Sequence, residues 1–103
     1  MNNYKFDWDP VKADSNWRKH GISFATAVQV FGDDDAVHEM ERVVDGEQRW
    51  QVIGRIAGFT VLLVAYFSED MDDGLEYVRI ISARRAERWE RKKYEESYRK
   101  AHR

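Results

Sequence analysis

The chain has 103 residues, of which 43% are hydrophobic and 35% charged, and its formal net charge is −2. This length and composition exclude a disordered chain and predict one domain, residues 1–103, with a core of its own. The lack of cysteine excludes disulfide bonds, thiolate metal sites and a cysteine nucleophile, and it agrees with a cytoplasmic location.

The first predicted elements are an extended piece at residues 5–8 and a helix directly after it. Asp9 is a suitable N-cap, and Pro10 suits the first helical position, where its missing N–H does no harm. The helix should end at His20, because Gly21 can adopt the left-handed conformation that commonly closes a helix.

A second helix is expected from Ser23, its N-cap, to Gly32. Its apolar residues repeat at helical spacing, which indicates one buried face. They are Phe24, Ala27, Val28 and Phe31.

Strands are predicted in the middle of the chain. Residues 36–44 suggest a weak strand, 49–56 and 59–67 form a hairpin, and 75–82 alternate as a last strand. From Ser82, taken as an N-cap, good helix formers predict a helix to the C-terminus, with residues 98–103 projecting or fraying. We therefore expect an α+β fold with two N-terminal helices, an antiparallel sheet of three to four strands and a C-terminal helix.

Neither a secretory signal nor a membrane segment is predicted. The first ten residues hold no apolar stretch, and the longest apolar run, 59–67, is far shorter than the roughly 18 residues that cross a bilayer. We therefore expect a soluble, cytoplasmic protein without a membrane partner.

Charge is distributed unevenly along the chain. Residues 84–103 contain nine Lys and Arg against four Asp and Glu, whereas residues 1–83 contain eight against fifteen. A basic C-terminal segment is thus attached to an acidic body.

The start of the last helix is a candidate phosphate site. Ser82, Arg84 and Arg85 should lie where free backbone N–H groups and the helix dipole favour an anion. The alternative is an ordinary solvated helix with ion pairs such as Glu87 with Arg91.

His20, which follows Lys19, is the histidine expected on an ordered element, and imidazole titrates in the range that general acid–base catalysis requires. Equally, a histidine cation is favoured at a helix C-terminus for its charge alone. No histidine pair has metal-ligand spacing, so we expect no metal site and no cofactor.

The arginines and tryptophans on the predicted elements each allow a functional and a structural interpretation. Arg49 and Arg55 should point to the same face of one strand, either as a functional pair or as a solvated rim. The tryptophans could stack on nucleobases, but they are more often core residues, Trp17 more so than Trp50.

The sequence as a whole resembles the BrnT family, the toxins of type II toxin–antitoxin pairs, from Phe6 to about Tyr94. The matching pieces are 6–13 (FDWDPVKA), Asn16, 19–24 (KHGISF), Ala27, Val30, Phe31, Arg49, Gly54, 80–86 (IISARRA), Glu90 and Tyr94. The Lys-His-Gly and Ile-Ser-Ala-Arg segments are specific because they occur together in this order.

The resemblance implies a RelE-like fold and RNA cleavage that arrests growth. It also implies neutralisation by a BrnA-type antitoxin, a ribbon-helix-helix protein through which the toxin would reach operator DNA. The catalytic candidates are His20, Arg49, Arg84, Arg85, Glu90 and Tyr94. The RNA-binding candidates are Lys19 and Ser82, to which we add Arg55 and Arg79.

The hypothesis that follows is a metal-independent endoribonuclease in which the RNA 2′-hydroxyl attacks the adjacent phosphorus. His20 or Glu90 would be the base and His20 or Tyr94 the acid, and the arginines would stabilise phosphoryl charge. Two alternatives are a non-catalytic nucleic-acid-binding module and a protein-interaction domain, each using the basic helix.

Overall fold

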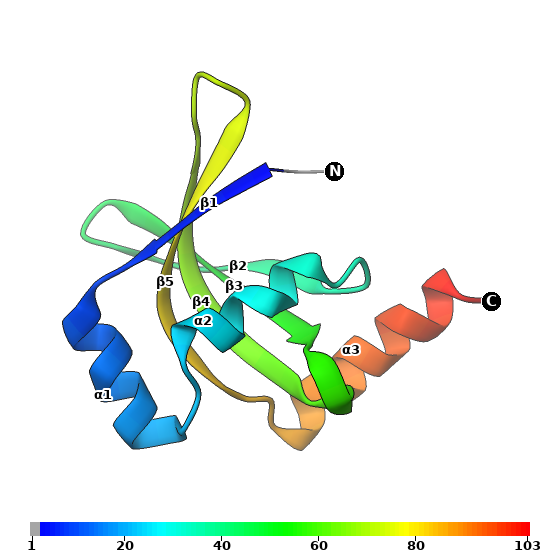
Figure 1. Cartoon of the computed structure of the whole chain (residues 1–103). Helices are drawn as coiled ribbons and strands as arrows, with labels where there is room; N and C mark the ends of the chain where they lie inside the picture. Colours follow the sequence, from blue (N-terminus) through cyan, green and yellow to red (C-terminus); the bar gives the residue numbers. More distant parts are fainter. Residues whose placement is uncertain (1–2) are drawn as a thin grey trace.

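Figure 1 shows a computed structural model of the chain, which describes residues 3–103. The predicted α+β class is confirmed, with two helices near the N-terminus and one helix after the last strand. The elements are β1 (Asn3–Trp8), α1 (Pro10–His20), α2 (Phe24–Ala27), the 3₁₀ helix η1 (Val28–Gly32), β2 (Val37–Val44), β3 (Glu47–Arg55), the 3₁₀ helix η2 (Ala57–Phe59), β4 (Val61–Asp70), β5 (Leu75–Arg85) and α3 (Arg88–Ala101).

The sheet has five strands in the order β1-β5-β4-β3-β2, one more than the largest number expected. The additional strand is the short extended piece at the N-terminus, which pairs in parallel with β5. It joins the sheet because Tyr4, Phe6 and Trp8 alternate toward the core and pack against it. All other neighbouring strands are antiparallel, including the predicted hairpin of β3 and β4.

The ends of α1 are those predicted from local sequence. The Asp9 carboxylate accepts a hydrogen bond from Val11 N–H at 2.9 Å, and Pro10 occupies the first helical position. Gly21 closes the helix with a φ of 66°.

The second helix differs from its prediction, because it is α-helical only through Ala27 and continues as the 3₁₀ helix η1. A 3₁₀ helix repeats every three residues. Its buried side chains are accordingly Phe24, Ala27 and Val30, whereas Val28 and Phe31 are half-buried.

The core lies between one face of the sheet and the layer formed by α1, α2 and η1 (Figure 1). Its strand residues alternate along β3, β4 and β5, as a sheet with one buried face requires. The cluster consists of Ile22, Phe24, Ala27, Val30, Val52, Leu62, Val64, Tyr66, Val78, Ile80 and Ala83.

The last helix begins later than predicted. Ser82 is not a helix cap but part of β5, which runs to Arg85, and α3 starts at Arg88 with Glu87 as its N-cap. Leu62 of β4 pairs with Arg85, so sheet pairing overrides the helix propensity of these residues. Of residues 98–103, expected to project or fray, those through Ala101 are helical.

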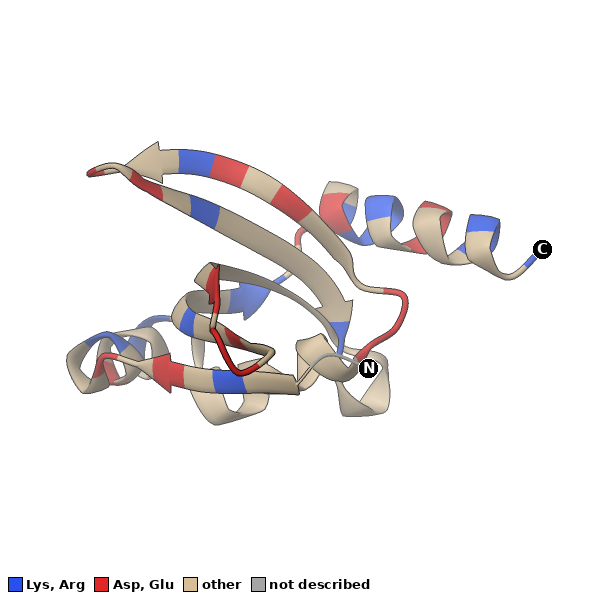
Figure 2. Cartoon of the chain, turned by 90° about the horizontal axis from the view of Figure 1, so that it is seen from above, with Lys and Arg blue, Asp and Glu red and all other residues tan. Residues whose placement is uncertain are grey.

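Polar contacts connect α3 with the acidic connection between η1 and β2, drawn in red near α3 in Figure 2. Tyr94 donates to Asp33 at 2.7 Å, and His102 Nε2 lies 2.9 Å from Asp35 Oδ1. Lys93 also pairs with Glu39 of β2. The basic C-terminal segment is therefore partly neutralised by the acidic body.

Within residues 3–103, no helix is long and apolar enough to cross a bilayer.

Gly54, in the middle of β3, has no room for a side chain. A Cβ atom there would lie 2.9 Å from Val30 Cβ and 3.3 Å from Ala36 Cβ. We expect Gly54→Ala to lower the free energy of unfolding by about 1–3 kcal/mol through overpacking, measured by urea denaturation. Gly32→Ala is the matched control, because no atom lies within 4 Å of its added Cβ. Equal losses in the two variants would contradict the prediction.

Candidate functional site

The candidate site lies on the face of the sheet opposite α1 and α2, which we call the open face. Side chains alternate along a strand, so the register of β3, β4 and β5 sets rows across this face. Two rows are Gln51, Ala65 and Ser82, and Ile53, Leu63 and Arg84. A third row holds Phe67 and Arg79, and Arg49 joins it when the register of β3 is continued by one residue before Trp50. Helix α3 contacts β3 at the end of the open face where Ile53 is buried.

A β-bulge at Ile81 decides which side chains of β5 reach the open face. Ile80 pairs with Tyr66, but Ser82 pairs with Ala65, so one residue of β5 has no counterpart on β4. Arg79 and Arg84 are five residues apart and would face opposite sides of a regular strand. The bulge brings both arginines to the open face.

Arg49 and Arg79 share one carboxylate, that of Glu47. Glu47 Oε1 lies 3.0 Å from Arg49 Nε and 2.5 Å from Arg79 Nη2. The guanidinium of Arg79 also lies over the Phe67 ring, 5.0 Å from its centroid. Two cations, one anion and one aromatic ring therefore form a compact cluster on three neighbouring strands.

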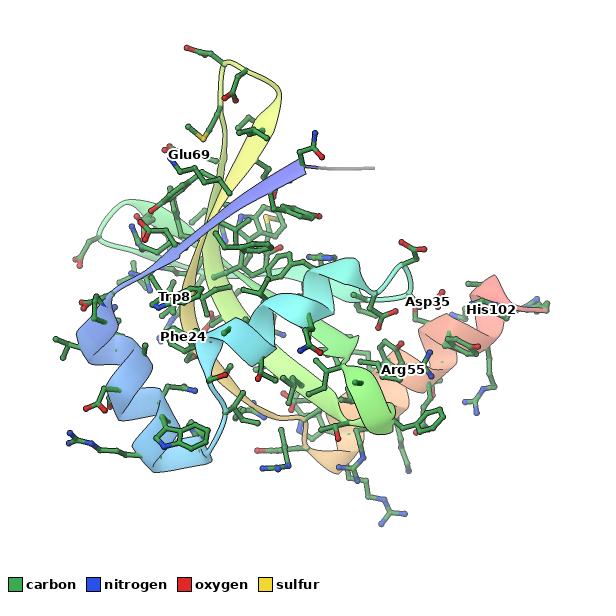
Figure 3. The ribbon with its side chains drawn as sticks, in the orientation of Figure 1. Trp8, Phe24, Asp35, Arg55, Glu69 and His102 are labelled. Atoms are coloured by element: carbon green, nitrogen blue, oxygen red, sulfur yellow. The ribbon has the colours of Figure 1, made fainter. Side chains whose placement is uncertain are left out.

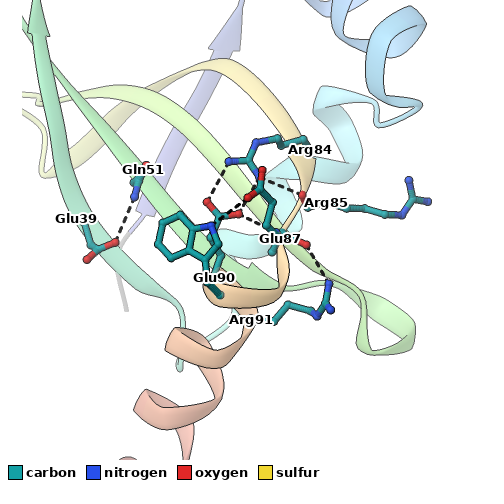
Figure 4. A network of polar contacts seen from close by, with 9 residues as sticks. Glu39, Gln51, Arg84, Arg85, Glu87, Glu90 and Arg91 are labelled. Atoms are coloured by element: carbon teal, nitrogen blue, oxygen red, sulfur yellow. Dashed lines mark hydrogen bonds and ion pairs between the residues drawn. The ribbon is translucent and has the colours of Figure 1, made fainter.

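Arg84 forms a bidentate ion pair with Glu90 of α3 (Figure 4). Arg84 Nη1 donates to Glu90 Oε1 at 2.7 Å, and Nη2 donates to Oε2 at 3.0 Å. The carboxylate also accepts from Glu87 N–H at 2.8 Å, as part of a capping box. Glu90 is only 2% exposed, so this network fixes Arg84 to the start of α3.

The pKa of each partner reflects this network. Burial raises the pKa of Glu90, but the hydrogen bonds from Arg84 and from Glu87 N–H outweigh it and hold the pKa below its usual value. The hydrogen bond to Glu90 raises the pKa of Arg84. At neutral pH, Glu90 is therefore a carboxylate whose lowered basicity makes it a weak proton acceptor.

The predicted phosphate site at the helix N-terminus is corrected by this geometry. Arg84 and Arg85 lie on β5, and the carboxylates of Glu87 and Glu90 already cap the N-terminus of α3. Arg85 is exposed and alternates away from Arg84. An anion on the open face would instead meet the side chains of the strand arginines.

Arg55 ends β3, beyond the row of Arg84. Tyr94, on α3, shares a hydrogen-bond acceptor with it. Asp33 accepts hydrogen bonds from both the Arg55 backbone N–H and the Tyr94 hydroxyl. Burial and this hydrogen bond raise the pKa of Tyr94. The Arg55 side chain is labelled in Figure 3. Its guanidinium carbon lies 5.5 Å from the ring centroid of Phe59 and 5.8 Å from that of Tyr98 of α3.

Lys19 and His20 are not brought to the open face. They end α1, which packs on the opposite side of the sheet through Ala13 and Asn16. Among residues 3–103, no hydrogen bond or ion pair joins Lys19 or His20 to an open-face arginine.

The tryptophans are not distributed between the core and the surface as predicted. Trp8 and Trp50 pack against the core, whereas Trp17 is 58% exposed and Trp89 is 59% exposed. The prediction for Trp17 is wrong because α1 turns Ala13 and Asn16 toward the sheet, and Trp17 follows Asn16 by about 100° around the helix.

Sequence reasoning missed the carboxylates and the amide that organise the open face. Glu39 binds Lys93 of α3 and accepts from Gln51 Nε2 at 3.3 Å (Figure 4). Glu47 precedes Arg49 by two residues, and this spacing alone places both on one face of a strand. Within the described residues, no group of three or more His, Asp or Glu side chains is placed to hold a metal ion.

Comparisons with known proteins indicate the family of this chain. The family model described as "Ribonuclease toxin, BrnT, of type II toxin-antitoxin system" matches residues 8–90. The 1.1 Å crystal structure of the Brucella abortus ribonuclease toxin BrnT is similar in fold, with a TM-score of 0.56 and 22% sequence identity. That match covers 84% of this chain and 100% of the Brucella chain. A search of curated proteins gives no match. Because the family model spans most of the sequence, the chain belongs to the BrnT family of ribonuclease toxins of type II toxin–antitoxin systems.

Proposed function

We propose that this ribonuclease toxin cleaves RNA on the open face by a metal-independent attack of the RNA 2′-hydroxyl on the adjacent phosphorus. The observation that carries the proposal is the gathering of Arg49, Arg79 and Arg84 on one side of the sheet. Guanidinium groups bind phosphate oxygens in a fixed, bidentate geometry. The 2′-oxygen bonds to phosphorus as the bond from phosphorus to the 5′-oxygen breaks. Water takes the 2′-hydroxyl proton and protonates the leaving 5′-oxygen.

Charge stabilisation by Arg84 is the main catalytic contribution in this proposal. A guanidinium has five N–H donors, and hydrogen bonds to Glu90 and to the Arg85 carbonyl engage three of them. Among the described residues, none accepts from Arg84 Nε–H or from the second N–H of Nη2. Arg84 is 33% exposed, so these two donors are available to a phosphoryl group that gains charge in the transition state.

Glu90 and Tyr94 act as positioning residues in this proposal. The lowered pKa of Glu90 and its three hydrogen bonds disfavour it as a general base. Tyr94 donates its hydroxyl proton to Asp33, and its raised pKa disfavours it as an acid. His20 belongs to the helix on the other side of the sheet. The Glu90 carboxylate instead holds the Arg84 guanidinium in place.

The protein partner in this proposal is a BrnA-type antitoxin with a ribbon-helix-helix DNA-binding domain. The family description implies a type II toxin–antitoxin pair, and such an antitoxin would also connect the toxin to operator DNA. We expect the toxin to meet both its RNA substrate and its antitoxin in the cytoplasm.

The test is incubation of the purified, antitoxin-free chain with total RNA in EDTA, followed by mapping of the new ends. We expect cleavage that survives EDTA and gives 2′,3′-cyclic phosphate and 5′-hydroxyl ends. An oligonucleotide with a single 2′-deoxy substitution at the cleaved nucleotide should stay intact, because it lacks the nucleophile. Cleavage only with added divalent cations, or 5′-phosphate ends, would contradict the mechanism. RNA that is bound but not cut would favour a non-catalytic binding module.

A further inference from the structure

Arg49 and Arg79 form a second cationic cluster on the open face, separate from Arg84. Their row lies four β3 residues from the row of Arg84. At a rise of about 3.3 Å per residue, the two rows are about 13 Å apart. One phosphate cannot contact both rows, so the Arg49 row would be a site of its own.

The Glu47 carboxylate leaves this cluster with a net positive charge and with free donors. Both arginines meet the same oxygen, Glu47 Oε1. Arg49 Nε is buried and makes no hydrogen bond of good geometry, although Glu47 lies 3.0 Å away. The Arg79 side chain is one-third exposed, so a second anion has access to the cluster.

We propose that Arg49 and Arg79 form a second phosphate subsite, which takes a non-scissile phosphodiester of single-stranded RNA. Glu47 is the internal anion that occupies this subsite in the free protein. The proposal rests on the proposed function, because it assigns this site to the same RNA strand. A carboxylate and a phosphodiester each present two charged oxygens to which a guanidinium can donate, so each can replace the other on the two arginines.

Competition with Glu47 has a measurable consequence for RNA affinity. RNA phosphate and the Glu47 carboxylate compete for the same two arginines. In Glu47→Gln the amide keeps the shape but loses the charge, so the arginines remain free to bind phosphate. We expect Glu47→Gln to bind RNA about two- to five-fold more tightly at low salt, a gain typical of one partly exposed charge contact.

The experiment measures binding of a fully 2′-O-methylated oligonucleotide, which cannot be cut, over a range of salt concentrations. Glu41→Gln is the matched control, because Glu41 carries the same charge on neighbouring β2 but pairs with Arg42. The gain in Glu47→Gln should exceed that in Glu41→Gln. It should disappear when Arg79→Gln is added, because the competition acts through Arg79.

Three results would overturn the proposal: no gain in Glu47→Gln, an equal gain in Glu41→Gln, or a gain that persists beside Arg79→Gln. If Glu47→Gln does not fold, the wild-type chain provides the second measurement. Inorganic pyrophosphate should shift the Nε–H NMR signals of Arg49 and Arg79, and unshifted signals would also overturn it. None of these measurements depends on cleavage. They can therefore contradict the subsite while the ribonuclease mechanism holds, and they can support the subsite even if that mechanism is wrong.

Discussion

Arg84→Ala is expected to lower the rate of RNA cleavage by about 10²- to 10³-fold, the usual effect of removing one donor that stabilises transition-state charge. The free Nε–H edge of Arg84 is the part of the open face best placed for a scissile phosphate. Arg85→Ala is the matched control, because Arg85 is the neighbouring arginine of β5 but alternates away from Arg84. It should lower cleavage much less. Single-turnover cleavage of a defined RNA checks both rates.

Loss of Arg84 also affects stability, because it leaves the buried Glu90 carboxylate without its cation. Breaking a buried ion pair from one side costs about 3–5 kcal/mol. The double variant Arg84→Ala/Glu90→Gln removes both charges and should recover much of this loss without recovering cleavage. If the double variant recovers cleavage together with stability, Arg84 has only a structural role.

Asn16→Ala is expected to cause a large loss of stability. The buried Asn16 amide donates to the carbonyls of Ile22 and Ala83, at 3.0 and 2.8 Å, and accepts from Ala83 N–H at 3.0 Å. It thereby joins α1 to β5 where the strand continues past the bulge. Alanine would leave three buried backbone groups unpaired, at about 1–3 kcal/mol each before relaxation.

We therefore expect Asn16→Ala to lower the free energy of unfolding by about 3–5 kcal/mol, measured by urea denaturation. Ser15→Ala is the control, because Ser15 is exposed on the same helix and alanine is the better helix former. Its stability should be unchanged or slightly raised. An Asn16→Ala variant as stable as Ser15→Ala would contradict this role of the amide.

The parts of the fold that could be predicted from sequence depend on local chemistry. Asp9 with Pro10, Gly21 and Ser23 each act on their own helix end, so these ends appear where expected. The start of α3 could not be predicted in this way. Ala83, Arg84 and Arg85 favour a helix locally, but pairing with β4 keeps them in a strand, and β4 is distant in sequence.

The candidate site was predictable only in part for the same reason. Strand periodicity places Glu47 and Arg49 on one face, and that signal was present in the sequence. Arg79 and Arg84 lie on the same face only because of the bulge at Ile81, which arises from the register between two strands. The ion pair of Arg84 with Glu90 depends in turn on where α3 begins.

The bulge also bears on how genes for this fold can change between Arg79 and Arg84. Substitutions there alter single side chains, but loss of one codon at Ile81 would restore a regular strand. Arg79 and Arg84 would then be four residues apart, so Ala83 would remain in the core and Arg84 on the open face. This segment can therefore lose that one residue without moving a later side chain of β5 to the other face of the sheet.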